Sequence, residues 1–281
     1  MNNLSKRVLS GLVLFSLLVL IIYAASSIDS KIGVYAIALI TLVIFWEFYQ
    51  FFEKKVIGLV FLSIPILSIT LIPNLLLDNI FYLIIISCLT WVLMSIRIII
   101  FDNPKMNNIE LFALGYLLIL PAFTAATWIY VNWNSSILLL IILGVSIADT
   151  SAYFVGKRLG KTQLLANTSP GKTLEGLIGA CIVTPIFLAL IAFFLDYQFI
   201  GFLIFGLILT PISFIGDIVF SYVKRSRNRK ESSNLIPGHG GFIDLLDGTI
   251  AVLTFFWMFA VAPTGRIGEI IYKNFLIYLI F

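Results

Sequence analysis

Charged residues are scarce in this chain. Only 11% of its 281 residues are Asp, Glu, Lys or Arg, and 60% are hydrophobic. About a quarter of an ordinary globular sequence is charged, so the composition excludes a soluble domain of this length. The mean hydropathy of +1.08 predicts an all-α, polytopic membrane protein.

Cysteine and histidine are also rare. Cys88 and Cys181 lie far apart in apolar stretches and lack the spacing of metal ligands. We interpret them as packing thiols, and no disulfide framework is expected. His239 is the only histidine, and one histidine cannot build a histidine-based metal cluster.

Apolar runs long enough for a transmembrane helix, about 20 residues, fill most of the chain. The first is interpreted as a retained anchor and not as a cleaved signal peptide. The segment Gly268–Phe281 is short for a span, so it is predicted to lie at the interface or to span partially. The nine predicted spans are Val8–Ala25, Ile32–Phe52, Val56–Ile72, Asn79–Ile100, Ile109–Tyr130, Ser135–Val155, Thr173–Leu195, Phe199–Tyr222 and Asp247–Val261.

The basic residues predict the orientation of these spans. With the N-terminus in the cytoplasm, 15 of the 18 Lys and Arg residues fall in cytoplasmic segments, as the positive-inside rule requires. The odd number of spans then puts the C-terminus outside. We therefore expect a multi-pass protein of the cell inner (plasma) membrane with a cytoplasmic N-terminus.

The two parts of the chain differ in polarity. Residues 1–131 contain few intramembrane polar groups and are predicted to form a transmembrane scaffold. Glu47 lies near the cytoplasmic end of its span, so an interfacial, snorkelling or helix-end role is favoured over chemistry. Residues 132–281 are predicted to form the catalytic transmembrane region.

The most informative stretch runs from Ser213 to Gly248. Asp217 lies in an apolar helix, five cations follow between Lys224 and Lys230, and a glycine-rich segment leads to Asp244 and Asp247. Acids inside apolar helices are costly in lipid and usually mark a functional site. Divalent metal and phosphate suit carboxylates, cations and glycine-rich backbone together.

The spacing inside this stretch places its charges. Asp217 and Lys224 are seven residues apart, so they share a helix face about 10 Å apart along the axis. Asp244 and Asp247 are three residues apart and also share a face. The glycines around His239 permit positive φ and close approach to a ligand.

A second polar stretch lies upstream. Asp149 stands near the cytoplasmic end of its span, and the triplets Gly160-Lys161-Thr162 and Gly171-Lys172-Thr173 follow. These triplets do not form a P-loop, because Val155 and Ala166 occupy the positions where that motif needs glycine.

The start of the next helix is predicted at Ser169 and Pro170. Serine is a favoured N-cap and proline a favoured first helical residue. Free N–H groups there, with Lys172 and Thr173, would hold a phosphate. An ordinary capped helix start is the equally supported alternative.

Three separated motifs resemble those of the bacterial phosphatidate cytidylyltransferases, also called CDP-diacylglycerol synthases. The resemblance covers roughly residues 149–248. The motifs are Asp149-Thr150-Ser151-Ala152-Tyr153 with Gly156-Lys157; Ser169-Pro170-Gly171-Lys172-Thr173-Leu174-Glu175-Gly176; and Gly216-Asp217, Ser221, Lys224-Arg225, Lys230-Glu231, Pro237-Gly238-His239-Gly240-Gly241 and Asp244-Leu245-Leu246-Asp247.

Two positions depart from the family pattern. Leu245 stands where the family has arginine, and Glu231 stands where it has aspartate. The first change removes a guanidinium that could pair with an acid or bind phosphate. Either a neighbour such as Arg225 or Arg229 replaces it, or activity is weakened.

The resemblance implies transfer of the cytidylyl group of CTP to phosphatidate, at a site on the cytoplasmic membrane boundary. Mg²⁺ is the implied cofactor, with a second monovalent or divalent cation as an open addition. The implied partners are CTP, phosphatidate, the lipid bilayer and a second copy in a homodimer, with no nucleic acid. The implied residues are Asp217, Asp244, Lys224 and Arg225 in catalysis; Asp149, Lys172, Thr173, Ser221, His239, Gly240 and Gly241 in substrate binding; and Asp217, Asp244 and Asp247 at the metal.

Two other functions stay open on the sequence. A CTP-dependent lipid kinase of the polyprenol type would use similar substrates but release CDP. An anion transporter would also need intramembrane acids and basic mouths, although the polar residues here gather at one face of the membrane only.

Overall fold

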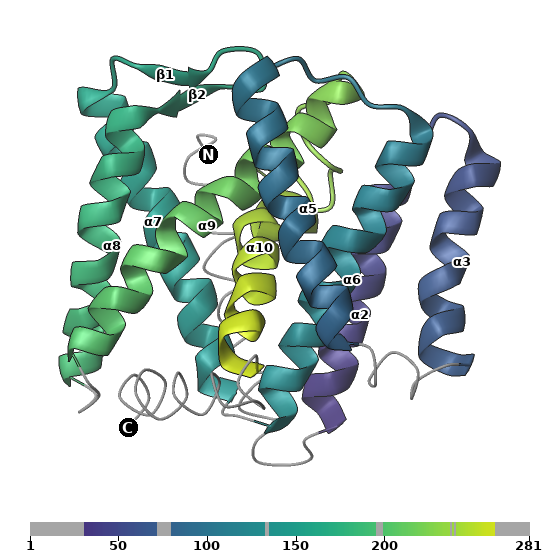
Figure 1. The fold of residues 1–281 in the computed structure, drawn as a ribbon, viewed down its shortest axis with the longest axis horizontal. Coiled ribbons are helices and arrows are strands. Elements are labelled where there is room, and N and C mark those ends of the chain that lie inside the picture. Colours follow the sequence, from purple (N-terminus) through teal and green to yellow (C-terminus); the bar gives the residue numbers. More distant parts are fainter. Residues whose placement is uncertain are drawn as a thin grey trace.

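The computed structural model describes residues 31–71, 80–132, 135–194, 199–236, 238 and 240–261. Within these residues the chain forms eight helices and one β-hairpin (Figure 1). The elements are α2 (Lys31–Tyr49), α3 (Lys55–Leu71), α5 (Ile80–Phe101), α6 (Asn108–Asn132), α7 (Ser135–Leu159), β1 (Gln163–Leu165), β2 (Ser169–Thr173), α8 (Leu174–Phe194), α9 (Phe199–Ser226) and α10 (Phe242–Val261).

Six of these helices, namely α2, α5, α6, α7, α8 and α9, are long and apolar enough to cross a membrane. The protein is therefore a mostly helical, multi-pass membrane protein, as predicted. Helices α3 and α10 also coincide with predicted spans. The predicted span Val8–Ala25 and the segment Gly268–Phe281 lie outside the described residues, so the count of nine spans stays a prediction.

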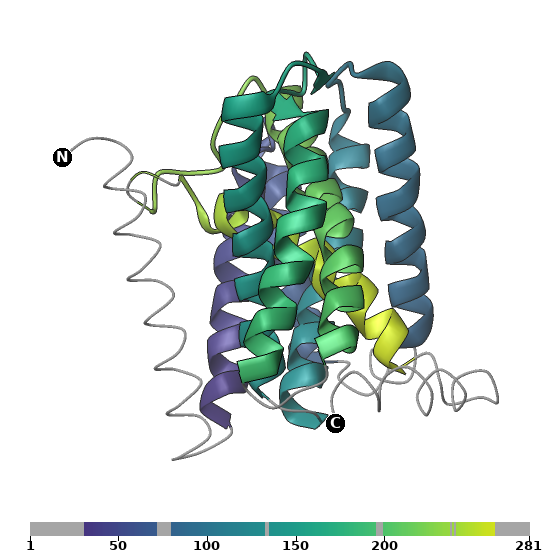
Figure 2. The same ribbon diagram turned by 90° about the vertical axis from the view of Figure 1, so that its left-hand side faces the viewer.

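Successive helices run in opposite directions, which gathers the loops at two ends of the bundle (Figures 1 and 2). Helices α5, α7 and α9 end toward the top of Figure 1, where the hairpin lies, and the loop after α9 descends to the start of α10, deeper in the bundle. Both polar motifs of the sequence lie at this end. We call it the polar end of the bundle.

Glycines set the crossing of α9 and α10. A Cβ on Gly216 of α9 would lie 2.8 Å from the Cα of Gly248 on α10, and a Cβ on Gly248 would lie 2.5 Å from Ser213 Oγ. No side chain fits between the two backbones at this point. Because Asp217 follows Gly216 and Asp247 precedes Gly248, the close approach brings these two acids together.

Glycines also bring α7 against α8. A Cβ on Gly176 would lie 2.8 Å from the carbonyl oxygen of Ala152 and 3.3 Å from the Cα of Gly156. This contact fixes the start of α8, and with it the preceding hairpin, against the helix that carries Asp149.

The predicted N-cap at Ser169 is wrong. Ser169 and Pro170 lie in β2, which pairs with β1 in antiparallel register, and α8 begins only at Leu174. Thr173 caps the helix, since its Oγ1 accepts a hydrogen bond of 3.2 Å from the N–H of Gly176. Proline is tolerated in β2 because a two-stranded sheet consists of edge strands, where a missing N–H does not break a ladder.

Candidate active site

Asp217 is held by a lysine from the hairpin. Lys172 Nζ, at the end of β2, forms an ion pair with Asp217 Oδ2, and the ammonium lies 4.4 Å from the ring centroid of Phe214. On the other side, Ser221 Oγ donates a hydrogen bond of 3.2 Å to Asp217 Oδ1. The hairpin thus delivers a cation to an acid 45 residues further along the chain.

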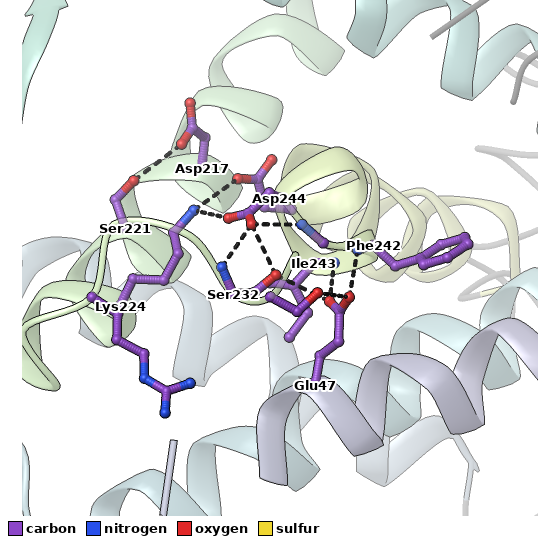
Figure 3. Close-up of polar contacts among 12 residues, drawn as sticks. Glu47, Asp217, Ser221, Lys224, Ser232, Phe242, Ile243 and Asp244 are labelled. Atoms are coloured by element: carbon purple, nitrogen blue, oxygen red, sulfur yellow. Dashed lines mark hydrogen bonds and ion pairs between the residues drawn. The ribbon is translucent and has the colours of Figure 1, made fainter. Parts of the chain in front are cut away.

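Both carboxylate oxygens of Asp244 accept hydrogen bonds. Its Oδ1 accepts from Lys224 Nζ at 2.6 Å. Its Oδ2 lies 2.7 Å from the N–H of Ser232, 2.9 Å from Ser232 Oγ and 2.9 Å from the N–H of Gly241 (Figure 3). As the third residue of α10, Asp244 reaches back to the N-cap position in the manner of a capping box.

Asp247 is buried beside the same lysine. Its Oδ1 accepts from the N–H of Gly248 at 2.8 Å, and its Oδ2 lies 4.0 Å from Lys224 Nζ. Lys224 itself is only 7% exposed. A charge buried this deeply is stable only when it is paired, and Asp244 and Asp247 supply the pairing.

Asp149 faces this group from α7 with an exposed side chain. It forms no hydrogen bond or ion pair with any described residue, but its charge acts on Asp217, Lys172 and Asp247. Helices α7, α9 and α10 thus bring four acids around two lysines, and 4 negative charges less 2 positive charges leave a formal charge of −2. We call these six residues, Asp149, Lys172, Asp217, Lys224, Asp244 and Asp247, the acid–lysine cluster.

The donor chemistry of the cluster fits a hard cation such as Mg²⁺, which prefers carboxylate oxygens. Asp149 and Asp247 Oδ2 make no hydrogen bond with described residues, whereas both oxygens of Asp244 are engaged. Nowhere in the described part of the chain do three His, Cys, Asp or Glu side chains already converge as a metal site. Ammonium groups stand beside the acids instead, and Lys172 would have to leave Asp217 for that acid to bind a cation through Oδ2.

The other predicted site residues have varied surroundings. Arg225 donates to backbone carbonyls, at 3.5 Å to Thr168 and 3.3 Å to Arg229. Gly240 has a φ of 100°, and a Cβ there would lie 2.5 Å from Asp244 Oδ2. A Cβ on Gly241 would collide with the side chains of Ser232 and Glu47. His239 lies outside the described residues, so its predicted role stays a prediction.

Arg225 and Arg229 are the two neighbours that the sequence offered in place of an arginine at position 245. Among the described residues, neither Arg225 nor Arg229 forms an ion pair. Arg229 lies instead over the ring of Phe51, at 5.7 Å from the centroid.

Glu47 of α2 is a residue whose role the sequence interpretation missed. It is fully buried, so its carboxylate does not reach water as that of a snorkelling side chain would. Its Oε1 accepts from the N–H of Phe242 at 2.8 Å, and its Oε2 accepts from the N–H of Ile243 at 2.8 Å (Figure 3). The helix end that it serves is that of α10, nearly 200 residues away, and not its own.

Asp102, between α5 and α6, is a second missed residue. It accepts hydrogen bonds from the N–H of Asn167 at 2.8 Å, the N–H of Thr168 at 2.9 Å and Thr168 Oγ1 at 2.6 Å. These contacts fasten the β1–β2 turn that precedes Lys172. The signal available in the sequence was an acid in a short loop beside a polar end, which is too common to single out.

Comparisons with known proteins identify the family of this chain. The model of the cytidylyltransferase family matches residues 5–262. The phosphatidate cytidylyltransferase of Bacillus subtilis is 27% identical over 283 residues, covering 92% of this chain and 97% of that protein. The one of Haemophilus influenzae is 39% identical over 130 residues, covering 44% and 45%, and the one of Aquifex aeolicus is 34% identical over 144 residues, covering 51% and 54%.

The alignments with the Haemophilus and Aquifex enzymes thus span about half the length of each relative, whereas the family match and the Bacillus alignment extend over most of the chain. The residue motifs named from the sequence lie within the matched region. The chain therefore belongs to the cytidylyltransferase family.

Proposed function

We propose that this protein transfers the cytidylyl group of CTP to phosphatidate, giving CDP-diacylglycerol and pyrophosphate for phospholipid biosynthesis. The observation that carries the proposal is the acid–lysine cluster, assembled by α7, α9, α10 and the hairpin at the end where the family motifs meet. Family membership supports a nucleotide and a lipid as the two substrates.

The reaction balances without a strong base. A phosphate oxygen of phosphatidate, already anionic, attacks the α-phosphorus of CTP, and the bond from that phosphorus to the α–β bridging oxygen breaks. Pyrophosphate leaves with that oxygen. The main barrier is the approach of two anions and the charge that develops on the leaving group, which positioned cations offset.

Lys172 and Lys224 are the cations that the cluster supplies for this purpose. Both form ion pairs with carboxylates. A bound triphosphate or lipid phosphate would compete with these carboxylates for the ammonium groups. Arg225 and Ser221 stand within a turn of Lys224 on α9. His239, Gly240 and Gly241 are proposed to line the nucleotide site, and Thr173 and Asp149 to border the phosphates.

Asp217, Asp244 and Asp247 are the proposed Mg²⁺ ligands, with Asp149 beside them. Asp149 and Asp247 Oδ2 make no hydrogen bond with described residues, whereas Asp217 Oδ2 would first have to lose Lys172. When bound, Mg²⁺ would neutralise phosphate oxygens and orient them for in-line displacement. The protein's part is to hold the acids at fixed positions, which the glycine crossing of α9 and α10 does.

The lipid would reach the cluster from the bilayer and CTP from the cytoplasm. This requires that the polar end of the bundle be cytoplasmic. Together with the predicted span Val8–Ala25, it would put the N-terminus in the cytoplasm, and the inner membrane is the proposed location. A homodimer is part of the proposal on the resemblance alone, and the mass of the protein in detergent would test it.

The test is an assay of purified protein with phosphatidate and CTP labelled at the α-phosphate, scored for a labelled CDP-lipid and for pyrophosphate. The matched control reaction uses CTP labelled at the γ-phosphate. Label in the lipid from γ-labelled CTP, with release of CDP, would replace the proposal with a lipid kinase. Solute flux across sealed vesicles without turnover of CTP would replace it with a transporter.

A further inference from the structure

Helix α10 begins without a side chain at its N-cap, although Asp244 within its first turn accepts from the N–H of that N-cap residue. Its N-cap position is Gly241, and the two following residues, Phe242 and Ile243, direct their N–H groups at Glu47. Unsatisfied N–H groups at a helix start normally find a partner in the N-cap side chain. Here that partner comes from α2, across the bundle.

Glu47 also binds the loop that precedes α10. Ser233 Oγ lies 2.7 Å from Oε1, and Ser232 Oγ lies 3.0 Å from Oε2. The carboxylate therefore accepts from Ser233 Oγ and from the N–H groups of Phe242 and Ile243, and it shares the single proton of the Ser232 hydroxyl with Asp244. It is fully buried, and no described Lys or Arg pairs with it. Hydrogen bonds and the positive end of the α10 dipole stabilise its charge.

Ser232 links Glu47 to the acid–lysine cluster. Its hydroxyl lies between Glu47 Oε2 and Asp244 Oδ2, at 3.0 and 2.9 Å. Its N–H donates to Asp244 as well, at 2.7 Å. Asp244 in turn binds Lys224, which stands beside Asp247. A continuous set of polar contacts thus runs from α2 to the cluster (Figure 3).

The N-cap residue Gly241 has no space for a side chain, because Glu47 and Ser232 occupy it. A Cβ there would collide with both carboxylate oxygens of Glu47 and with Ser232 Oγ. A glycine is therefore required at the N-cap for the carboxylate of Glu47 to take the place of a local cap.

We propose that Glu47 is a positioning residue for the reaction, acting through the start of α10 and Ser232 on Asp244 and Lys224. The effect on kcat depends on the proposed function, whereas the role of Glu47 in fixing the start of α10 does not. Glutamine in its place would present an NH₂ group to a backbone N–H and a serine hydroxyl. The hydrogen bonds that one of the two carboxylate oxygens now accepts would be lost, and the start of α10 would shift.

The experiment compares Glu47→Gln with two matched controls in the full-length protein. Glu110→Gln makes the same chemical change at the start of α6, where Glu110 accepts from the N–H of Asn107 at 3.2 Å. Phe45→Ala disrupts the packing of the same helix α2 against α3 and α6, since Phe45 packs on Phe61 and Tyr116. Each variant is assayed per amount of folded protein, well below its melting temperature.

Glu47→Gln is expected to lower kcat by about 10- to 100-fold and to raise the Mg²⁺ concentration for half-maximal activity by about fivefold, since displaced acids bind the cation less well. Amide hydrogen exchange in residues 241–246 is expected to rise by at least about tenfold, as their hydrogen bonds weaken. Both controls are expected to stay within about twofold of the wild type in the kinetic values and in exchange at 241–246.

Unchanged exchange at 241–246 in Glu47→Gln would overturn the inference, and so would raised exchange with normal kcat. An equal change in Phe45→Ala would also overturn it, because the effect would then be one of general stability. Should Glu47→Gln fail to fold, the double change Ser232→Ala and Ser233→Ala tests the same contact, with normal exchange and kcat counting against it. If the wild type makes no CDP-lipid, the proposed function fails, while the exchange experiment still decides whether Glu47 fixes α10.

Discussion

The helices α2 to α6 and the helices α7 to α10 pack in different ways. The first group packs large aromatic side chains, with Phe61 lying against Phe48 and Tyr116 at centroid distances of 5.4 and 4.7 Å. The second group brings backbones together at glycines so that charged side chains can meet. Bulky aromatic side chains fill the space between the helices of the first group, whereas close helix crossings in the second group bring the polar residues beside the glycines together.

The two groups are joined by two carboxylates. Glu47 holds the start of α10, and Asp102 holds the turn of the hairpin that carries Lys172. The N-terminal half therefore contributes to the placement of Lys172 and of Asp244. The division at residue 131 predicted from the sequence stays a prediction, but contacts that support the cluster cross it.

The largest effect is expected from the acids of the second group. Asp217→Asn or Asp244→Asn should lower kcat/KM for formation of CDP-diacylglycerol by about 1000-fold, because each removes a charge that positions cations at the phosphates. Purified variants are compared with the wild type at saturating Mg²⁺. Near-normal turnover of either protein would show that the corresponding acid is not needed, and size-exclusion profiles would confirm that both still fold.

The next effect concerns the cation from the hairpin. Lys172→Met keeps the aliphatic stem but removes the ammonium that pairs with Asp217, and we expect a loss of about 100-fold in kcat/KM. Lys161→Met, an exposed lysine before β1 at the same end, is the control and should stay within about twofold. Equal losses in the two variants would indicate a general effect of positive charge and not a role of the ion pair.

A smaller effect is expected from the first group. Asp102→Asn makes the same chemical change as Asp217→Asn but at the hairpin turn, where an amide would face the N–H groups of Asn167 or Thr168. Weakening hydrogen bonds to a charged acceptor costs about 1.5–3 kcal/mol locally, so kcat/KM should fall about five- to tenfold. Proteolysis of the β1–β2 turn should speed up in parallel, and a loss as large as that of Asp217→Asn would mean that Asp102 acts in the site itself.

The smallest effect is expected at the position that departs from the family pattern. Leu245→Arg should leave kcat/KM unchanged or raise it, because it restores the residue that the family has between its two acids. The comparison is made at several Mg²⁺ concentrations, with Leu246→Arg as the control for an added charge on α10. A severe loss confined to Leu245→Arg would show that leucine is an adaptation of this protein.

Much of the helical architecture followed from the sequence because apolar length alone specifies a membrane helix. Eight predicted spans coincide with described helices, and the acids at 217, 244 and 247 were singled out because charge is costly in lipid. The start of α8 was predicted wrongly, since Ser169 and Pro170 are as compatible with an edge strand as with a helix start. Pairing with β1 makes these residues part of a strand.

The role of Glu47 could not be found in the same way. Its position in the sequence resembles that of any acid near a helix end, and nothing local indicates that the partner lies in α10. Similarly, the pairing of Lys172 with Asp217 and of Lys224 with Asp244 depends on contacts between helices, which the period of a fully apolar helix does not reveal.

The sequence by itself determined that the chain is a helical membrane protein and which acids and lysines gather at one end of its helices. Those properties depend on the free energy of transferring side chains between water and lipid, and each residue contributes to that free energy independently of its tertiary contacts. Only the tertiary structure decided which acid meets which lysine, and that a carboxylate from α2 completes the start of α10. Such contacts join residues far apart in the chain, and their geometry is fixed by how closely the helix backbones approach.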